Sequence, residues 1–298
     1  MITTAKPLCE VLRYAQLGVA VSNIATSVAF YEKIGFQMLA THENVTVLRN
    51  RGGLELHMCL CDKPLDDGKN LLMDFPASKY PGHTHAAFSV PSVPAAVTYL
   101  QSQGIAISGE RPGKDRIASV FTRDPDFTTY EYERNDGPDD DVEMTADMIG
   151  YPQCLDHVGI RVSNPEERWL WYAEKLGFVN AVSKLELHSE PLQNRHPWIS
   201  RTLTNVDINF LVNANESLPG NRLFQDGLRP GIIFISFAVA SVSEAEARLK
   251  EHGVPTFRDS ELHLSPFSSL ANRITPGQLE SIFIHDGDFN LIRLVNDA

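Results

Sequence analysis

Four polar residues stand in strand-like segments at positions where apolar residues would suit a buried core: Gln16, Glu55, His85 and Glu131. Side chains alternate along a strand with a period of two, so residues on one face of neighbouring strands can converge. Two carboxylates, one imidazole and one amide oxygen form a ligand set for a divalent ion such as Zn, Ni, Mn, Co or Mg. Without a cation, burying two carboxylates together would cost several kcal/mol. The sequence therefore predicts one metal site built from these residues.

Two of these positions have neighbours that could take their place. His57 lies two residues after Glu55 and therefore on the same strand face, where it is an alternative ligand. Glu133 follows Glu131 at the same spacing, and periodicity alone does not decide which carboxylate faces inward. His85 has apolar neighbours, so a buried core histidine is its simpler interpretation.

Three segments of the first half return in the second half: QLGVAVSN (16–23) as HVGIRVSN (157–164), PGHTHAAFSV (81–90) as PGIIFISFAV (230–239), and DPDFTTYE (124–131) as DGDFNLIR (286–293). The second copy replaces His85 by Phe234 and Glu131 by Arg293. A duplication that keeps its apolar frame but loses polar residues at equivalent places indicates one working site and one degenerate site.

Each half begins with a strand followed by an amphipathic helix. Asn23 and Asn164 are suitable N-caps, and Pro165 occupies the first helical position after the second of them. A strand and a helix recur inside each half, and strand-like segments separated by turn residues follow every helix. This order predicts four β-α-β-β-β modules and an α+β fold, with paired modules forming a curved, barrel-like mixed sheet in each of two tandem domains.

The repeat also predicts where the domains divide. We expect a metal-bearing domain at 1–136, an acidic linker at 137–150 (GPDDDVEMTADMIG), and a second domain with a degenerate site at 151–298. Between the last two repeated segments, the offset grows from 149 to 162 residues, which leaves about thirteen extra residues in the second domain. They fall within 258–278, as a lid or a surface loop.

Composition restricts the class of partner. The formal net charge of −12 disfavours nucleic acid and anionic membrane surfaces. No segment approaches the ~20 apolar residues of a spanning helix, and residues 1–16 do not resemble a signal peptide. Four scattered cysteines are too few for a disulfide framework. We therefore expect a cytoplasmic protein with a small-molecule substrate, with a homodimer left open.

At these residues the chain resembles the vicinal oxygen chelate superfamily, which includes glyoxalase I, bleomycin resistance proteins and extradiol dioxygenases. The resemblance rests on four segments: SVAFYEKIGF, WLWYAEKLGF, HAAFSV and RDPDFTTYEYE, the last similar to the family ending DPDGN-x-x-E-L. The glyoxalase I order of ligands implies Gln16, Glu55, His85 and Glu131, and it selects Glu131 over Glu133. Phe127 and Thr128 stand where the family ending has glycine and asparagine.

The resemblance implies a glyoxalase I-like lyase or isomerase that uses one divalent metal ion (Zn, Ni, Mn, Co or Fe). Such an enzyme would act on a small substrate with vicinal oxygens, with Glu131 taking the proton. One alternative is an Fe(II) extradiol-type ring-cleaving dioxygenase, whose family site has two histidines and one carboxylate, so that His57 would have to supply the second imidazole.

Another alternative is a metal-free binding or resistance protein with an aromatic cavity, for which three residues are candidates: Trp171, Phe210 and Phe234. In the second half, the residues equivalent to the predicted ligands are His157, Asp207 or Asn209, Phe234 and Arg293. These do not form a metal-binding set, so we expect His157 to be a relic or a hydrogen-bonding core residue.

Overall fold

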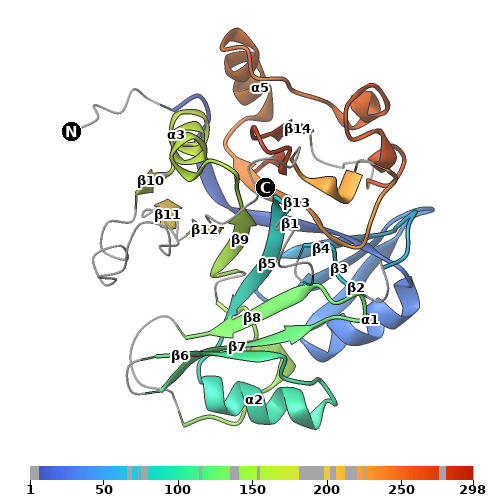
Figure 1. The fold of residues 1–298 in the computed structure, drawn as a ribbon, viewed down its shortest axis with the longest axis vertical. Coiled ribbons are helices and arrows are strands. Elements are labelled where there is room, and N and C mark those ends of the chain that lie inside the picture. Colours follow the sequence, from blue (N-terminus) through green and yellow to red (C-terminus); the bar gives the residue numbers. More distant parts are fainter. Residues whose placement is uncertain are drawn as a thin grey trace.

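Four successive modules of strands and helices make up the chain in its computed structural model (Figure 1). The structure describes residues 7–65, 69–72, 74, 80–113, 116–134, 141–152, 155–180, 198–201, 206–211, 220–224, 226–274 and 280–297. The first module contains β1 (Val11–Val21), α1 (Ile24–Lys33), β2 (Phe36–Thr41), β3 (Thr46–Asn50) and β4 (Glu55–Leu60). The second contains β5 (Gly82–Ser89), α2 (Val93–Ser102), β6 (Gly109–Pro112), β7 (Ile117–Arg123) and β8 (Thr129–Glu133).

The second half of the chain repeats this order. The third module contains β9 (His157–Arg161), α3 (Pro165–Leu176), β10 (Val179–Asn180), β11 (Trp198–Arg201) and β12 (Val206–Leu211). The fourth contains β13 (Gly231–Val239), α5 (Val242–Glu251), β14 (Ser281–His285) and β15 (Leu291–Asn296). The fifteen strands of the described residues form one curved mixed sheet, which confirms the predicted α+β class.

The helices begin where the sequence places a side-chain cap. Asn23 accepts a hydrogen bond from the backbone N–H of Thr26 at 3.0 Å, and Asn164 accepts one from Glu167 at 3.2 Å. Each bond satisfies one of the backbone donors that a helix start leaves without an intrahelical partner. The helix α3 ends at Gly177, whose φ of 72° is the left-handed conformation that glycine adopts readily.

Strand pairing joins modules from different halves of the chain. β1 pairs with β4 in parallel and with β13 in antiparallel orientation, whereas β5 pairs with β8 in parallel and with β9 in antiparallel orientation. In Figure 1, blue β1 accordingly runs beside orange β13, and teal β5 runs beside yellow-green β9. We call the first and fourth modules the outer half-sheet, and the second and third modules the inner half-sheet.

The predicted domain boundaries at 136 and 151 stay predictions, but the strand pairing runs across them. Part of the predicted linker 137–150 also packs against the second module: Met144 and Ile149 are buried, and the backbone N–H of Gly150 donates to the carbonyl of Ser89 at 2.9 Å. The described residues at 141–150 therefore belong to the packed structure.

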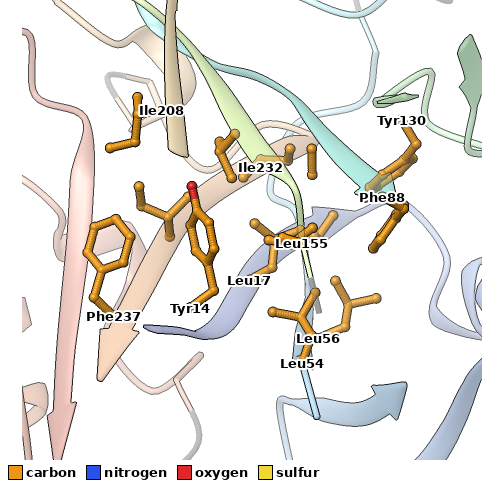
Figure 2. Packing of buried hydrophobic residues seen from close by; sticks show 14 of the residues in the cluster. Tyr14, Leu17, Leu54, Leu56, Phe88, Tyr130, Leu155, Ile208, Ile232 and Phe237 are labelled. Atoms are coloured by element: carbon orange, nitrogen blue, oxygen red, sulfur yellow. The ribbon is translucent and has the colours of Figure 1, made fainter. Parts of the chain in front are cut away.

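One hydrophobic core extends behind both half-sheets. It joins Leu17 and Leu56 of the first module to Phe88 of the second, Ile208 of the third and Ile232 of the fourth (Figure 2). Burial of such side chains contributes about 1.5–3 kcal/mol each. This core therefore stabilises the two half-sheets together.

A second core covers the opposite face of the outer half-sheet, on the side of Ala20 and Phe234. The extra residues of the fourth module supply much of it: Leu262, Phe267 and Leu270 pack with Phe234 and further apolar residues. The segment predicted as a lid or surface loop thus fills the face of the outer half-sheet with apolar side chains.

Two glycines let a ring lie flat against the neighbouring strand. Gly159 is opposite His85 across β9 and β5, and a Cβ on it would lie 2.0 Å from Cε1 of the His85 ring. Gly18 is opposite Phe234 across β1 and β13, where a Cβ would lie 2.2 Å from Cε1 of that ring. The repeat therefore keeps the same close approach in both half-sheets, although the ring has changed from imidazole to phenyl.

We predict that Gly159→Ala lowers the free energy of unfolding by about 1–3 kcal/mol, because the added methyl group overlaps the His85 ring and both strands must shift. Equilibrium denaturation checks this prediction. Gly109→Ala in β6 is the matched control, since its Cβ would meet only Phe121, at 3.7 Å. If Gly159→Ala and Gly109→Ala lower the free energy of unfolding equally, then overlap with the His85 ring is not the cause of the destabilisation.

Candidate metal centre

The register of three strands brings His85, Glu131 and His157 together. Ala87 on β5 is opposite Glu131 on β8 and opposite His157 on β9, so these three positions form one row across the inner half-sheet. Directly paired residues share a sheet face, and His85 lies two residues before Ala87 on that same face. A small alanine at the centre of the row leaves room for the longer side chains around it.

We call His85, Glu131 and His157 the His–His–Glu cluster. The two Nε2 atoms of the histidines lie 3.1 Å apart. The Oε2 atom of Glu131 lies 3.3 Å from Nε2 of His85 and 3.5 Å from Nε2 of His157. All three side chains are buried. The donor atoms therefore face one another in a space from which bulk water is excluded.

The other ring nitrogen of each histidine has a hydrogen-bond partner of its own. The Thr84 hydroxyl donates its proton to the carbonyl of Gly159 at 3.1 Å, so it accepts from Nδ1 of His85 at 3.0 Å. Nδ1 of His157 lies 2.8 Å from Oδ2 of Asp156, which accepts its proton. In the neutral imidazole, both arrangements leave the lone pair on Nε2, the atom that faces Glu131, whereas a protonated imidazole donates from Nε2 to that carboxylate.

The two oxygens of Glu131 have different surroundings. Oε2 faces the imidazoles, whereas Oε1 accepts from the Ser119 hydroxyl at 2.5 Å and lies 2.8 Å from Nη2 of Arg111. Burial raises the pKa of Glu131, but the hydrogen bonds to His157 and His85 outweigh it and leave this pKa far below its ordinary value. Glu131 is therefore a stable carboxylate with one oxygen directed at the cluster.

The pKa values of the two histidines shift in opposite directions from their ordinary value. Burial lowers the pKa of His157, yet hydrogen bonds to the surrounding carboxylates of Asp156, Glu131 and Glu133 outweigh it and raise this pKa well above its ordinary value. Burial lowers the pKa of His85. In the absence of an ion, a proton on His157 thus balances part of the buried negative charge.

The donor set of the cluster fits a divalent transition-metal ion. Two imidazole nitrogens and one carboxylate oxygen, each with its second polar atom already held, are typical of sites that bind zinc or non-haem iron. The three donor atoms also form one of the two groups of described His, Cys, Asp and Glu side chains whose ligand atoms lie within 4.8 Å of one another. The other group consists of Glu133, Asp156 and His157.

The equivalent place in the outer half-sheet holds an arginine. Ser236 is opposite Gln16 and Arg293, just as Ala87 is opposite His157 and Glu131. Nη1 of Arg293 donates to Oε1 of Gln16 at 3.1 Å. A guanidinium therefore occupies the position in the repeat where the inner half-sheet has the carboxylate ligand.

Glu55 and His57 belong to this outer network. Oε2 of Glu55 lies 3.0 Å from Nε2 of His57 and accepts from Nε2 of Gln16 at 3.3 Å. Hydrogen bonds from His57 and Arg49 lower the pKa of Glu55 to about 2. The carboxylate is thus paired with the Arg49 guanidinium and hydrogen-bonded to His57.

The structure divides the four predicted ligands into two pairs. Gln16 and Glu55 lie in the outer half-sheet, whereas His85 and Glu131 lie in the inner one, because β1 pairs with β4 and β13, and β5 pairs with β8 and β9. The two groups of described ligand atoms within 4.8 Å include neither Glu55 nor the alternative His57.

His157, rather than the predicted Gln16, lies beside His85 and Glu131. The repeat contains a signal for His157, because HVGIRVSN aligns this residue with the predicted ligand Gln16. The prediction of a separate site in each half hides this signal, since it assigns His157 to the half with the degenerate site. Asp207 on β12 is opposite His157 on β9, just as Glu55 on β4 is opposite Gln16 on β1. The side chains of Asp207, Asn209 and Phe210 lie outside the described residues. Of the three candidate residues for an aromatic cavity, the remaining two, Trp171 and Phe234, pack in hydrophobic cores.

Among the described residues, the structure contains no helix with the length and apolar character needed to cross a membrane. No curated protein sequence is significantly similar to this chain.

Similar solved structures share the fold along almost the whole chain. Glyoxalase I from Zea mays aligns over 95% of this chain and 92% of its own, with a TM-score of 0.57 and 15% identity. A putative dioxygenase from Bacillus subtilis subsp. subtilis str. 168 aligns over 97% of this chain and 86% of its own, with a TM-score of 0.64 and 10% identity. The cppA protein from Streptococcus pneumoniae TIGR4 aligns over 97% of this chain and all of its own, with a TM-score of 0.52 and 11% identity.

Residues 13–132 match the family model of the Glyoxalase/Bleomycin resistance protein/Dioxygenase superfamily. The matched segment contains the first two modules, and the last two repeat their order of elements. The first two modules are therefore similar in sequence to this superfamily, the vicinal oxygen chelate group that the chain resembles.

Proposed function

We propose that this protein is a metal-dependent enzyme whose ion is held by His85, His157 and Glu131 and binds two adjacent oxygens of a small substrate. One observation carries the proposal: three buried donor atoms from three strands lie within 3.1–3.5 Å of one another. A divalent ion bound there supplies a Lewis acid for vicinal oxygens and, if it is Fe(II), the redox chemistry that dioxygen requires.

The surrounding residues prepare the ligands for this role. Thr84 and Asp156 hold the imidazoles in the tautomer that presents Nε2. Ser119 and Arg111 hold Oε1 of Glu131, so that Oε2 alone is directed at the imidazoles. Little reorganisation is therefore needed before an ion is bound.

Between the two reactions that the sequence suggested, the ligand set favours the Fe(II) dioxygenase. Two histidines and one carboxylate with open positions are typical of non-haem Fe(II) oxygenases. Glu131 is a poor base, because its Oε1 atom accepts from the Ser119 hydroxyl and forms an ion pair with Arg111. The name of the Bacillus subtilis structure, a putative dioxygenase, agrees with this choice.

A glyoxalase I-like lyase is the second candidate, and the register of Asp207 is what favours it. This residue stands opposite His157 on β12, as Glu55 stands opposite Gln16 on β4. In general, a ligand set of two histidines and two carboxylates suits proton transfer at Zn or Ni.

We predict that the wild-type protein binds one divalent ion per chain and that His85→Ala and His157→Ala each abolish this binding, because each removes an imidazole ligand. Elemental analysis after reconstitution and gel filtration measures the bound ion. Glu55→Gln is the matched control, since Glu55 belongs to the outer network. Loss of the ion in Glu55→Gln would contradict the proposed site. If the wild type binds no ion, the proposed enzyme is wrong and the metal-free binding protein is the alternative that stays.

We predict that Asp156→Asn weakens metal affinity about 10- to 100-fold, because the amide no longer holds Nδ1 of His157 as a carboxylate does. Competition with a coloured chelator measures the affinity. The matched control is Asp74→Asn, which changes a carboxylate paired with Arg123 instead of a ligand. An affinity unchanged by Asp156→Asn would show that this hydrogen bond does not tune the site.

We predict that the Fe(II)-loaded protein consumes dioxygen in the presence of catechols, whereas the Zn(II)- or Ni(II)-loaded protein does not isomerise the hemithioacetal of methylglyoxal and glutathione. An oxygen electrode and an absorbance assay measure the two reactions. The opposite pattern, lyase activity without oxygen uptake, would establish the second candidate.

A further inference from the structure

Arg111 on β6 lies on the same face of the inner half-sheet as the His–His–Glu cluster. It is opposite Ser119 on β7, and Ser119 is opposite Glu133 on β8. Directly paired residues share a face, so this row runs beside the row that contains Glu131. The guanidinium therefore reaches the cluster from the edge of the half-sheet.

A single nitrogen of Arg111 makes its contacts with the cluster. Nη2 lies 2.8 Å from Oε1 of Glu131 and also contacts Oε2 of Glu133. Within the described part of the chain, Nε and Nη1 have no hydrogen-bond partner. The donors of these two nitrogens are thus available to another group.

The exposure of Arg111 differs from that of the carboxylates behind it. Its side chain is 39% exposed, whereas those of Glu131 and Glu133 are 2% and 9% exposed. Arg293 of the outer half-sheet shows how an arginine with a structural role is placed, because its side chain is 2% exposed and both of its Nη atoms contact protein oxygens. Arg111 instead keeps part of its side chain exposed to solvent.

The surface beside Arg111 is open and partly apolar. Phe121 is half-buried on β7, with its ring edge-on to His85 at 6.4 Å between centroids. Gly109 is opposite Phe121 on β6, and a Cβ there would meet only the Phe121 ring. Gly109, two residues before Arg111 on the same face of β6, therefore has no side chain that covers the Phe121 ring from that side.

We infer that Arg111 recognises an oxyanion of the substrate, such as a carboxylate, while adjacent oxygens of the same molecule bind the ion, so that the substrate is a small anion. The inference rests on the proposed function of the His–His–Glu cluster. Nε–H and Nη1–H lie on different edges of the guanidinium, and within the described residues each can donate a charge-assisted hydrogen bond to an oxyanion oxygen. This local cation also offsets the repulsion of an anion by a chain whose net charge is −12.

The test compares three ligands that share vicinal oxygens on the full chain loaded with Co(II). These are 3,4-dihydroxybenzoate, its neutral carboxamide and unsubstituted catechol, and each is titrated through the visible absorption of the cobalt ion. The wild-type protein should bind the benzoate at least about tenfold more tightly than the carboxamide, as expected for a charged hydrogen-bonded pair.

Arg111→Gln should reduce this preference to about onefold and leave the bound cobalt in place, because the Ser119 hydroxyl still donates to Oε1 of Glu131. Arg123→Gln is the matched control: it removes the same charge from β7, where Arg123 pairs with Asp74, and should keep the preference. Equal binding of benzoate and carboxamide by the wild type, or a preference that survives Arg111→Gln, would overturn the inference.

The experiment separates this inference from the proposed function. If the wild type holds no Co(II), or if catechol leaves the cobalt absorption unchanged, then the proposed site fails and the role of Arg111 falls with it. If catechol changes the absorption but no ligand shows a preference for the negative charge, then the metal site stands and only the role of Arg111 is wrong.

Discussion

The antiparallel pairing of β5 with β9 is the constraint on which the candidate site depends. It places Gly159 against the His85 ring and His157 in the same row as Glu131. Backbone pairing fixes such a register strongly, because a slip of one residue would turn every side chain to the other face. The site thus follows from a contact between residues about 70 positions apart in the chain.

The outer half-sheet shows the same register with different side chains at the equivalent positions. Arg293 replaces the carboxylate ligand and Phe234 replaces the histidine, while apolar residues of 258–278 pack over that face. A buried guanidinium that bonds to Gln16 and Asp259 supplies positive charge beside Glu55. This half-sheet therefore keeps the register of the inner half-sheet and places a protein cation beside its carboxylate.

Local pattern in the sequence was sufficient for the modules, the N-caps at Asn23 and Asn164, and the α+β class. These depend on periodicity and capping, which short segments determine. The grouping of Gln16 and Glu55 apart from His85 and Glu131 depends on which modules pair, and each module is equally compatible with either partner. The alignment of His157 with Gln16 was visible, but only the pairing of β5 with β9 shows that it faces Glu131.

The exchange of modules between the halves also sets an order of events during synthesis. His85 and Glu131 leave the ribosome before His157, so the emerging chain carries an imidazole and a carboxylate that lack their third partner. β13 must then be made before β1 finds its antiparallel neighbour. At the proposed site, an ion would therefore find all three ligands only after β9, the first strand of the second copy, has been made and has paired with β5.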